Sequence, residues 1–432
     1  MTIATRSRAT GIMLAPLRWL ERSRGWRRRL LIVAYLIVGL IGGVLIWRAT
    51  SLNNLPDVGD PFDVKAFVRS SWVAESEDAF VLYRKAGEAM KNSTVTNNWN
   101  LMWLAVRSGW TKAPPEVREW TESNREALKI WREGTKRPGG IPERLEKMGR
   151  FDETPLNHKL YYLGQAALLE GSKFQEAGDL AGALEWYLAA ARSCHHLSNK
   201  SRLSWRQTAE NIGDQTRDRL IAWAFDPRTN ATLLRKALDE VLSLDARTPP
   251  TSDALKAEYI SLIRSVGDPS RMVKESGSQL NLSYSHEQTG RWLAAYILLR
   301  REPERARRVV QLFFANWLAQ CDKPVASRPR LIGNDPRYPI WGVYVADPTA
   351  APGARAIAPE RLFAWLDSTM LTWRVLTMYP MNFPDAFRDR QSRSVLIVTL
   401  AEQLYQRETG RESPSVQALV PKYLKAVPEG YK

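Results

Sequence analysis

The strongest constraint on what this chain can fold into is an apolar run near its N-terminus. Residues Leu30 to Trp47 read LLIVAYLIVGLIGGVLIW, and none of them is charged. An α-helix over this run would be about 27 Å long, close to the roughly 30 Å thickness of a bilayer's hydrocarbon core. Because no later stretch of comparable length lacks charged residues, the sequence predicts a single-pass membrane protein with its transmembrane helix at residues 30–47.

The charges on either side of the run predict its orientation. Residues 1–29 form a basic segment that ends in Arg27, Arg28 and Arg29, whereas Asp57 and Asp60 follow the run. The positive-inside rule then puts the basic segment in the cytoplasm. The rest of the chain is expected on the far side of a bacterial inner (cytoplasmic) membrane, in the periplasm or an equivalent extracytoplasmic space.

The alternative interpretation of the run is a cleaved signal peptide. An uncleaved anchor is favoured, because the run is longer than the apolar core of most signal peptides. In addition, Trp47 stands where a cleavage site needs a small residue.

Composition excludes several classes of protein. The chain of 432 residues has a net charge of +16, but eight arginines and a single acid precede residue 30, so the remainder is only mildly basic. That remainder carries no nucleic-acid footprint. Two cysteines rule out a disulfide scaffold and a four-cysteine metal site. A disulfide between Cys194 and Cys321 stays open, because an extracytoplasmic location permits one while the spacing gives it no support.

Hydrophobic periodicity predicts a mainly α fold after the membrane segment. Turn-forming residues mark 48–75 as a linker, and residues 76–320 read as a helical domain that begins with an apolar stripe from Ala79 to Met90, capped by Ser76. Residues 321–358, rich in proline and glycine, predict an irregular connection with a short strand inside Pro339–Val345. Residues 359–432 read as C-terminal helices and a capping tail. Further helices are predicted at 115–136, 157–177, 180–197, 203–225, 230–244, 252–266, 285–299, 303–320, 360–378 and 385–408.

Residues 159–197 resemble one tetratricopeptide repeat, a hairpin of two antiparallel helices. The matching residues, at the spacing that the family uses, are Gly171, Phe174, Ala183, Tyr187 and Ala190. Small residues at Gly171 and Ala183 would let the two helices approach closely, with aromatic rings filling the crevice between them.

This hairpin departs from the family pattern at three positions. The family's tryptophan, leucine and closing proline are replaced by Ala167, Glu170 and His195, and no second copy appears in register further along the chain. A single repeat cannot bury its own apolar face. The neighbouring segments are therefore expected to be degenerate or unrelated helical pairs.

The C-terminal segment, residues 401–428, resembles helix-then-loop segments of pseudopilin-type envelope proteins. The matching residues are Leu404, Tyr405, Gly410, Pro414, Leu419, Val420, Pro421, Tyr423, Leu424 and Pro428. The resemblance implies a shared local packing motif, and the whole chain is similar to single-pass bacterial envelope proteins with a helical exported domain. Because the tail is apolar, we expect it to fold back on the domain, with Ser413 capping a short helix that Pro421 ends.

The sequence predicts no catalytic, cofactor-binding or metal-binding site. His286 and Glu287 begin a zinc-protease motif, but Gly290 stands where the second histidine is required. Cys194, His195 and His196 are adjacent on a predicted helix and so point about 100° apart, which prevents them from converging on one ion. Cys194 is expected in the core.

Tryptophans and glutamates near residues 99–131 allow a sharper hypothesis. Aromatic platforms beside carboxylates are typical of glycan hydrolases. The simpler interpretation is a solvated acidic helix face with tryptophans that pack between helices. The residues concerned are Trp99, Trp103, Trp110, Trp120, Trp131, Glu116, Glu119, Glu122 and Glu126.

The predicted function is a membrane-anchored helical scaffold that binds a protein or peptide partner in the bacterial envelope and uses no cofactor. The membrane contact is the helix at Leu30–Trp47. The missing catalytic set favours this scaffold over the two alternatives. These are an envelope enzyme acting on cell-wall glycan and an accessory subunit of a secretion or pilus-like machine.

Overall fold

The computed structural model describes residues 25–50, 52, 55–146, 155–267, 297, 299–323, 327–329, 331–332, 343–344 and 386–431. They are mainly α-helical, as predicted. They fall into two compact units, one with the described residues up to 57 and from 297 to 306, the other with residues 58–267 and 307–431. The helix predicted at 360–378, nearly all of that at 285–299 and most of the irregular connection lie outside the described residues.

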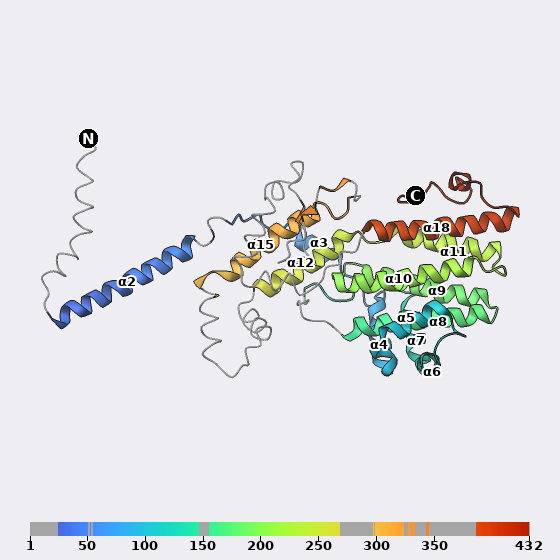
Figure 1. Ribbon diagram of the computed structural model, residues 1–432, viewed down its shortest axis with the longest axis horizontal. Coiled ribbons are helices and arrows are strands. Elements are labelled where there is room, and N and C mark those ends of the chain that lie inside the picture. Colours follow the sequence, from blue (N-terminus) through green and yellow to red (C-terminus); the bar gives the residue numbers. More distant parts are fainter. Residues whose placement is uncertain are drawn as a thin grey trace. The chain divides into compact units, whose positions relative to one another are not determined.

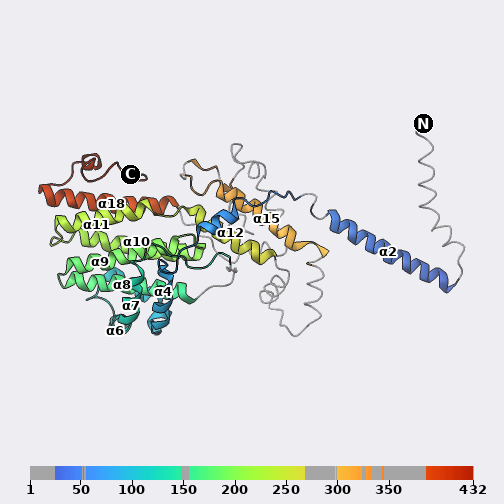
Figure 2. The same cartoon turned by 180° about the vertical axis from the view of Figure 1, so that it is seen from behind.

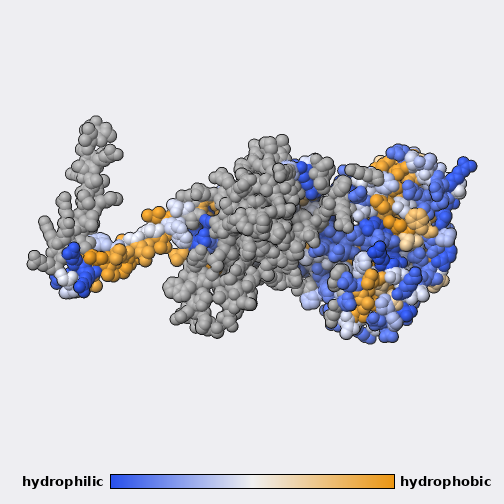
Figure 3. Space-filling view, viewed as in Figure 1, coloured by the Kyte–Doolittle hydropathy of each residue, from blue (hydrophilic) through white to orange (hydrophobic). Residues whose placement is uncertain are grey.

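The first unit contains α2, Trp26–Thr50, which includes the predicted membrane segment. Within the part of the chain that the structure describes, α2 is the one helix long and apolar enough to cross a membrane; helices of signal sequences meet the same test. None of its residues is buried. Figure 3 shows the apolar surface along this helix, with hydrophilic side chains at the end where it begins.

The second unit holds most of the described helices. The predicted helices within the described residues are present, with ends that differ by a few residues except at 115–136. The helices and the two 3-10 turns are α3 (Val64–Ser70), α4 (Ala79–Ala89), η1 (Thr94–Asn97), α5 (Trp99–Ser108), α6 (Pro115–Ser123), α7 (Arg125–Gly134), α8 (Pro155–Glu176), α9 (Leu180–Ser198), α10 (Leu203–Ala224), α11 (Ala231–Ala246), α12 (Thr251–Gly267), α15 (Glu302–Leu318, which begins in the first unit), α18 (Ala386–Thr409) and η3 (Val416–Leu419). A two-residue strand, β1 (Leu331–Ile332), pairs antiparallel with β2 (Val343–Tyr344), inside the predicted strand segment.

The single helix predicted at 115–136 is wrong, because the chain breaks at Asn124 into α6 and α7. The Asn124 side chain donates to the Trp120 carbonyl (2.9 Å) and accepts from the Lys91 backbone N–H (2.7 Å). An asparagine that bonds to the backbone in this way competes with the regular helical ladder.

Three other local predictions need correction. The predicted linker contains α3, which Asp63 caps and whose Phe67 is buried. Asp78, and not Ser76, caps α4, by accepting from the Phe80 N–H at 2.9 Å. In the tail the cap is Ser415 in place of Ser413. In the last two cases a side chain two residues from the predicted cap takes the first free helical N–H groups.

Helices α8, α9, α10, α11 and α18 lie side by side and form the body of the second unit (Figures 1 and 2). Four of them make a closed ring in which α9 packs on α10, α10 on α18, α18 on α11 and α11 on α9. The two diagonal pairs, α10 with α11 and α9 with α18, do not pack closely. The core of this ring therefore has to be filled by side chains from all four helices.

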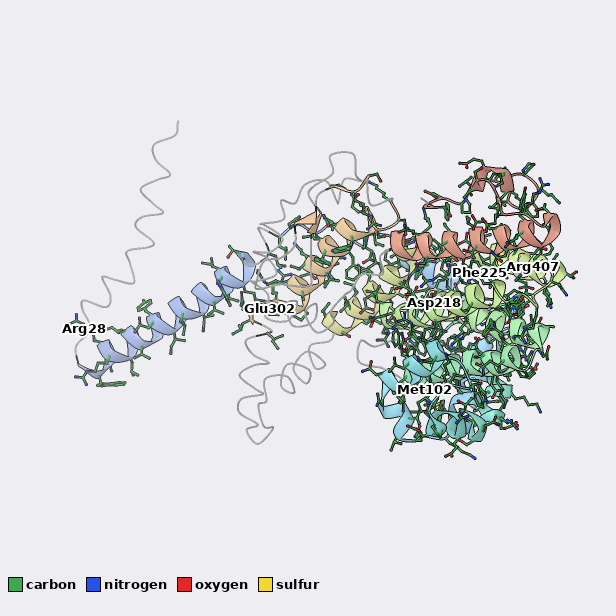
Figure 4. All side chains as sticks on the ribbon, turned by 45° about the vertical axis from the view of Figure 1, so that its right-hand side comes forward. Arg28, Met102, Asp218, Phe225, Glu302 and Arg407 are labelled. Atoms are coloured by element: carbon green, nitrogen blue, oxygen red, sulfur yellow. The ribbon has the colours of Figure 1, made fainter. Side chains whose placement is uncertain are left out.

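One end of the ring is sealed. The buried Trp223 of α10 donates from Nε1 to the Leu180 carbonyl at the start of α9 (3.0 Å). Arg407 of α18 donates to the carbonyls of Thr229 (3.0 Å) and Asp226 (3.1 Å) in the α10–α11 turn. Figure 4 labels Arg407 and Phe225 at this end.

Helices α8 and α9 form the predicted helical hairpin, joined by a turn in which Gly178 has a φ of +89°. A Cβ added at Gly171 would clash with the ring of the buried Tyr187, so a glycine permits the close approach. Ala183 is fully buried. The antiparallel pair and its packing residues are as predicted from the sequence, whereas membership of the tetratricopeptide family stays a prediction.

The tail folds back on α18. Leu419 and Leu424 are buried, and the ring of Tyr423 packs edge-on against Tyr405 of α18 at 5.7 Å. The Tyr423 hydroxyl and the Lys422 ammonium each bond to Glu408, both at 2.8 Å. The C-terminal segment is thus part of the folded unit.

Candidate functional site

A polar groove runs between α8 and α10 in the second unit. Half-buried or exposed side chains line it: Asn157, His158 and Tyr161 from α8, and Ser204, Thr208 and Asn211 from α10, with Trp205 buried beside them. Pro155 and His158 also line a neighbouring hollow with Asn92, Ser93 and Thr96. The two hollows therefore meet at the start of α8.

The polar side chains follow the helical repeat. Asn157, Tyr161 and Gln165 are four residues apart on α8, and Ser204, Thr208, Asn211 and Gln215 are three or four apart on α10. Residues at these intervals share one helix face. The groove thus lies between two facing rows of amide and hydroxyl groups.

Deeper contacts hold the two rows in place. The buried Gln165 joins the rows, because its Nε2 donates to Gln215 Oε1 at 3.1 Å and to the Tyr161 hydroxyl at 3.2 Å. Burial raises the pKa of Tyr161, which keeps its phenol protonated. Asn157 Nδ2 reaches the Ser204 carbonyl at 3.4 Å, while its buried Oδ1 has no partner among the described residues.

The cations around the groove are engaged by the protein itself. The guanidinium of the buried Arg202 makes two bonds of 3.0 Å to the Glu143 carboxylate. Lys159 donates to the Gly87 carbonyl at 2.7 Å. Among the described residues no carboxylate lines the groove. The groove therefore offers neutral hydrogen-bonding groups in place of free charge.

The tryptophans and glutamates of the glycan hypothesis do not gather at this groove. Trp120 and Trp131 are core residues. Trp103 and Trp110 are half-buried and lie under the cations of Arg107 (5.3 Å) and Lys173 (4.6 Å). Glu116, Glu119 and Glu126 are exposed, whereas Glu122 pairs with Lys173 and Arg125. The side chain of Trp99 lies outside the described residues.

The structure separates the residues of the Cys194-His195-His196 motif. Cys194 is half-buried and lines a hollow at the open end of the four-helix ring, so its predicted core position is only partly correct. His196 is buried, and its Nδ1 lies 2.9 Å from the Tyr83 hydroxyl. Burial lowers the pKa of His196 to about 4, so the ring is neutral at pH 7.

The remaining sequence candidates form no site in the described part of the chain. Cys194 and Cys321 are not joined in a disulfide, and burial raises the pKa of the Cys321 thiol to about 12. In those same residues no three side chains of His, Cys, Asp or Glu lie together as a metal site would need. His286 and Glu287 fall outside them.

Sequence reasoning missed the polar rows although their signal is in the chain. Neutral polar residues recur on one face of the segments at 157–165 and 204–215. Each row alone reads as an ordinary solvated helix face, and only the packing of α8 beside α10 makes a groove of them. No protein-family model, curated protein or solved structure matches this chain.

Proposed function

We propose that this protein is a membrane-anchored helical scaffold that holds an extended peptide segment of a partner protein in the groove between α8 and α10. The observation that carries the proposal is the pair of facing rows of amide and hydroxyl side chains. Amides and hydroxyls both donate and accept hydrogen bonds. An extended peptide offers alternating N–H and C=O groups, which such rows can pair with whatever its sequence.

The order of packing supports the same function. Helix α8 packs on α9 and α9 on α10, and α18 packs on both α10 and α11. Stacked helical pairs of this kind typically present elongated surfaces for peptide segments. The tetratricopeptide-like residues at Gly171, Ala183 and Tyr187 are consistent with that architecture.

We assign α2 as the uncleaved anchor of the scaffold in a bacterial inner membrane, with its N-terminal end in the cytoplasm. Its surface is unburied along the whole helix, as lipid contact requires. Trp26 and Trp47 are exposed near its two ends, where tryptophan favours the bilayer interface. The folded unit that carries the groove would then be extracytoplasmic.

The test is selection of peptides from a random display library on the full chain in detergent. The selected peptides should bind 10-fold or more weakly to the Asn157→Ala/Asn211→Ala variant, since the loss of about 1 kcal/mol per hydrogen bond is cumulative. Gln417→Ala removes an exposed amide on η3, outside the groove, and should leave binding unchanged. Peptides whose affinity is insensitive to the groove variants, or a library that yields no binder, would contradict the proposal.

A further inference from the structure

A second hollow, separate from the peptide groove, is lined by cations. Lys136 and Arg137 come from the turn after α7, Arg192 and His195 from α9, and Arg247 from the residue that follows α11. The buried His196 forms part of its wall. No carboxylate lines this hollow among the residues that the structure describes.

Two of the arginines are not neutralised by a carboxylate. The guanidinium of Arg137 makes no hydrogen bond or ion pair with the described residues; only its backbone groups are engaged. Arg247 uses Nε on the Ser243 carbonyl at 3.1 Å, which leaves its other N–H groups available. By contrast, Arg192 pairs with Glu240 at 3.2 Å, and Lys136 with Glu133 at 2.7 Å.

The half-buried His195 lines this hollow and also the hollow at the open end of the ring. His195 Nδ1 is shielded from solvent and has no hydrogen-bond partner among the described residues. Burial lowers the pKa of His195, and the positive charge of Arg247 lowers it further. The ring is therefore neutral at pH 7 and adds no positive charge to the hollow. The positive charge of the hollow therefore comes from its lysine and its arginines.

A simpler explanation for the cations is that they interact with the negatively polarised C-terminal ends of helices. Helices α7, α9 and α11 all end here, and each C-terminus carries roughly half a negative charge. At α7, however, carbonyls of the last turn already accept from the N–H groups of Thr135, Lys136 and Arg137. The dipole effect also fades within the last turn. Helix ends therefore account for Arg247 on the Ser243 carbonyl and leave the Arg137 guanidinium unexplained.

The hollow at the open end of the ring makes a useful contrast. Three arginines line it as well, but each is paired with a lining acid: Arg206 with Glu210 (3.2 Å), Arg217 with Asp214 (2.8 Å) and Arg393 with Asp245 (2.6 Å). A ligand anion there would have to displace a carboxylate. Such competition is absent at Arg137.

We propose that the hollow formed by Lys136, Arg137, Arg192, His195 and Arg247 binds a phosphate-bearing anion. The planar guanidinium groups can each hold two phosphate oxygens. The phosphate can belong to a soluble molecule or to a lipid headgroup, since both present the same oxygens.

Calorimetric titration of the full chain in a non-ionic detergent with inorganic pyrophosphate tests this site. We expect saturable binding at one site, weakened about 10-fold by Arg137→Gln or Arg247→Gln and further by the double variant. These side chains are half-buried or exposed and have no carboxylate partner among the described residues, so their replacement should leave thermal unfolding unchanged.

The matched control is the Arg411→Gln/Lys425→Gln pair, which removes the same charge from exposed positions on the tail. Binding that does not saturate, or that the control weakens as much as the double variant does, would overturn the proposal and indicate non-specific attraction to a basic protein. Competition with glycerol phosphate and short-chain phosphatidylglycerol then separates the two sources. Preference for the lipid identifies a headgroup site, and equal competition a soluble phosphate.

Discussion

Glu170 occupies the position in α8 at which the tetratricopeptide pattern has leucine. Its side chain is 8% exposed and its Oε1 has no hydrogen-bond partner among the described residues, with the Lys173 ammonium 4.0 Å away. Burial raises its pKa above the usual value of 4.5. Lys173 has a closer partner in Glu122. The buried carboxylate of Glu170 thus has only a weak interaction with Lys173 to offset the cost of its burial.

We therefore expect Glu170→Leu to increase the free energy of unfolding by about 1–2 kcal/mol at neutral pH. The folded state binds the Glu170 proton more tightly than the unfolded state does. The destabilising effect of the ionised Glu170 carboxylate is therefore present in full at neutral pH and disappears as the pH falls below the pKa of Glu170 in the unfolded state. The increase in the free energy of unfolding that Glu170→Leu produces should therefore become smaller as the pH falls.

Chemical denaturation of the full chain in detergent, at neutral pH and near pH 4, measures both effects. Glu119→Leu is the control, because Glu119 lies exposed on α6, and a change within about 0.5 kcal/mol is expected. A destabilising Glu170→Leu at neutral pH would contradict this prediction and show that the Glu170 carboxylate stabilises the fold.

At the scale of the elements, the tail makes the sharpest prediction. Removing residues 411–432 takes away Leu419, Tyr423 and Leu424, whose burial against α18 and its neighbours stabilises the unit. The loss should be about 3 kcal/mol or more and should promote aggregation, because apolar surface becomes exposed.

Two measurements check this. Leu424→Ala should lower the stability by about 2–5 kcal/mol through the cavity it leaves, whereas Lys425→Ala, at an exposed neighbour, should not. In limited proteolysis, rapid cleavage near Arg407 or Arg411 with an intact core would mean that the tail is detached from the unit in solution.

The elements also show how far sequence reasoning reaches. Apolar stripes predicted the long helices α8 to α12 and α18, because each stripe is a property of one segment. The break at Asn124 was not predicted, because it depends on a hydrogen bond with Lys91, which is distant in the chain. The polar groove and the basic hollow could not be predicted from the sequence for the same reason. Their walls come from separate helices, and Arg137, Arg192 and Arg247 reveal nothing individually.

At the scale of the whole molecule, the prediction concerns orientation. The arginines at 27–29 should keep the N-terminal end of α2 in the cytoplasm. A reporter active only outside the cytoplasm, fused after Lys432, should therefore be active. Replacing all three arginines by glutamate should reduce that activity or invert the protein. Activity of a cytoplasm-dependent reporter at Lys432 would reverse the proposed topology.

The closed ring of α9, α10, α11 and α18 has a consequence for how the protein is made. Three of these helices are neighbours in sequence, but the fourth arrives only after residues 247–385 have been synthesised. At roughly 5–20 residues per second, translation leaves the inner faces of the first three uncovered for seconds. Contacts between such distant segments also form slowly. Nascent chains that end before α18 should thus be the aggregation-prone species and should depend on chaperones until the last helix is available.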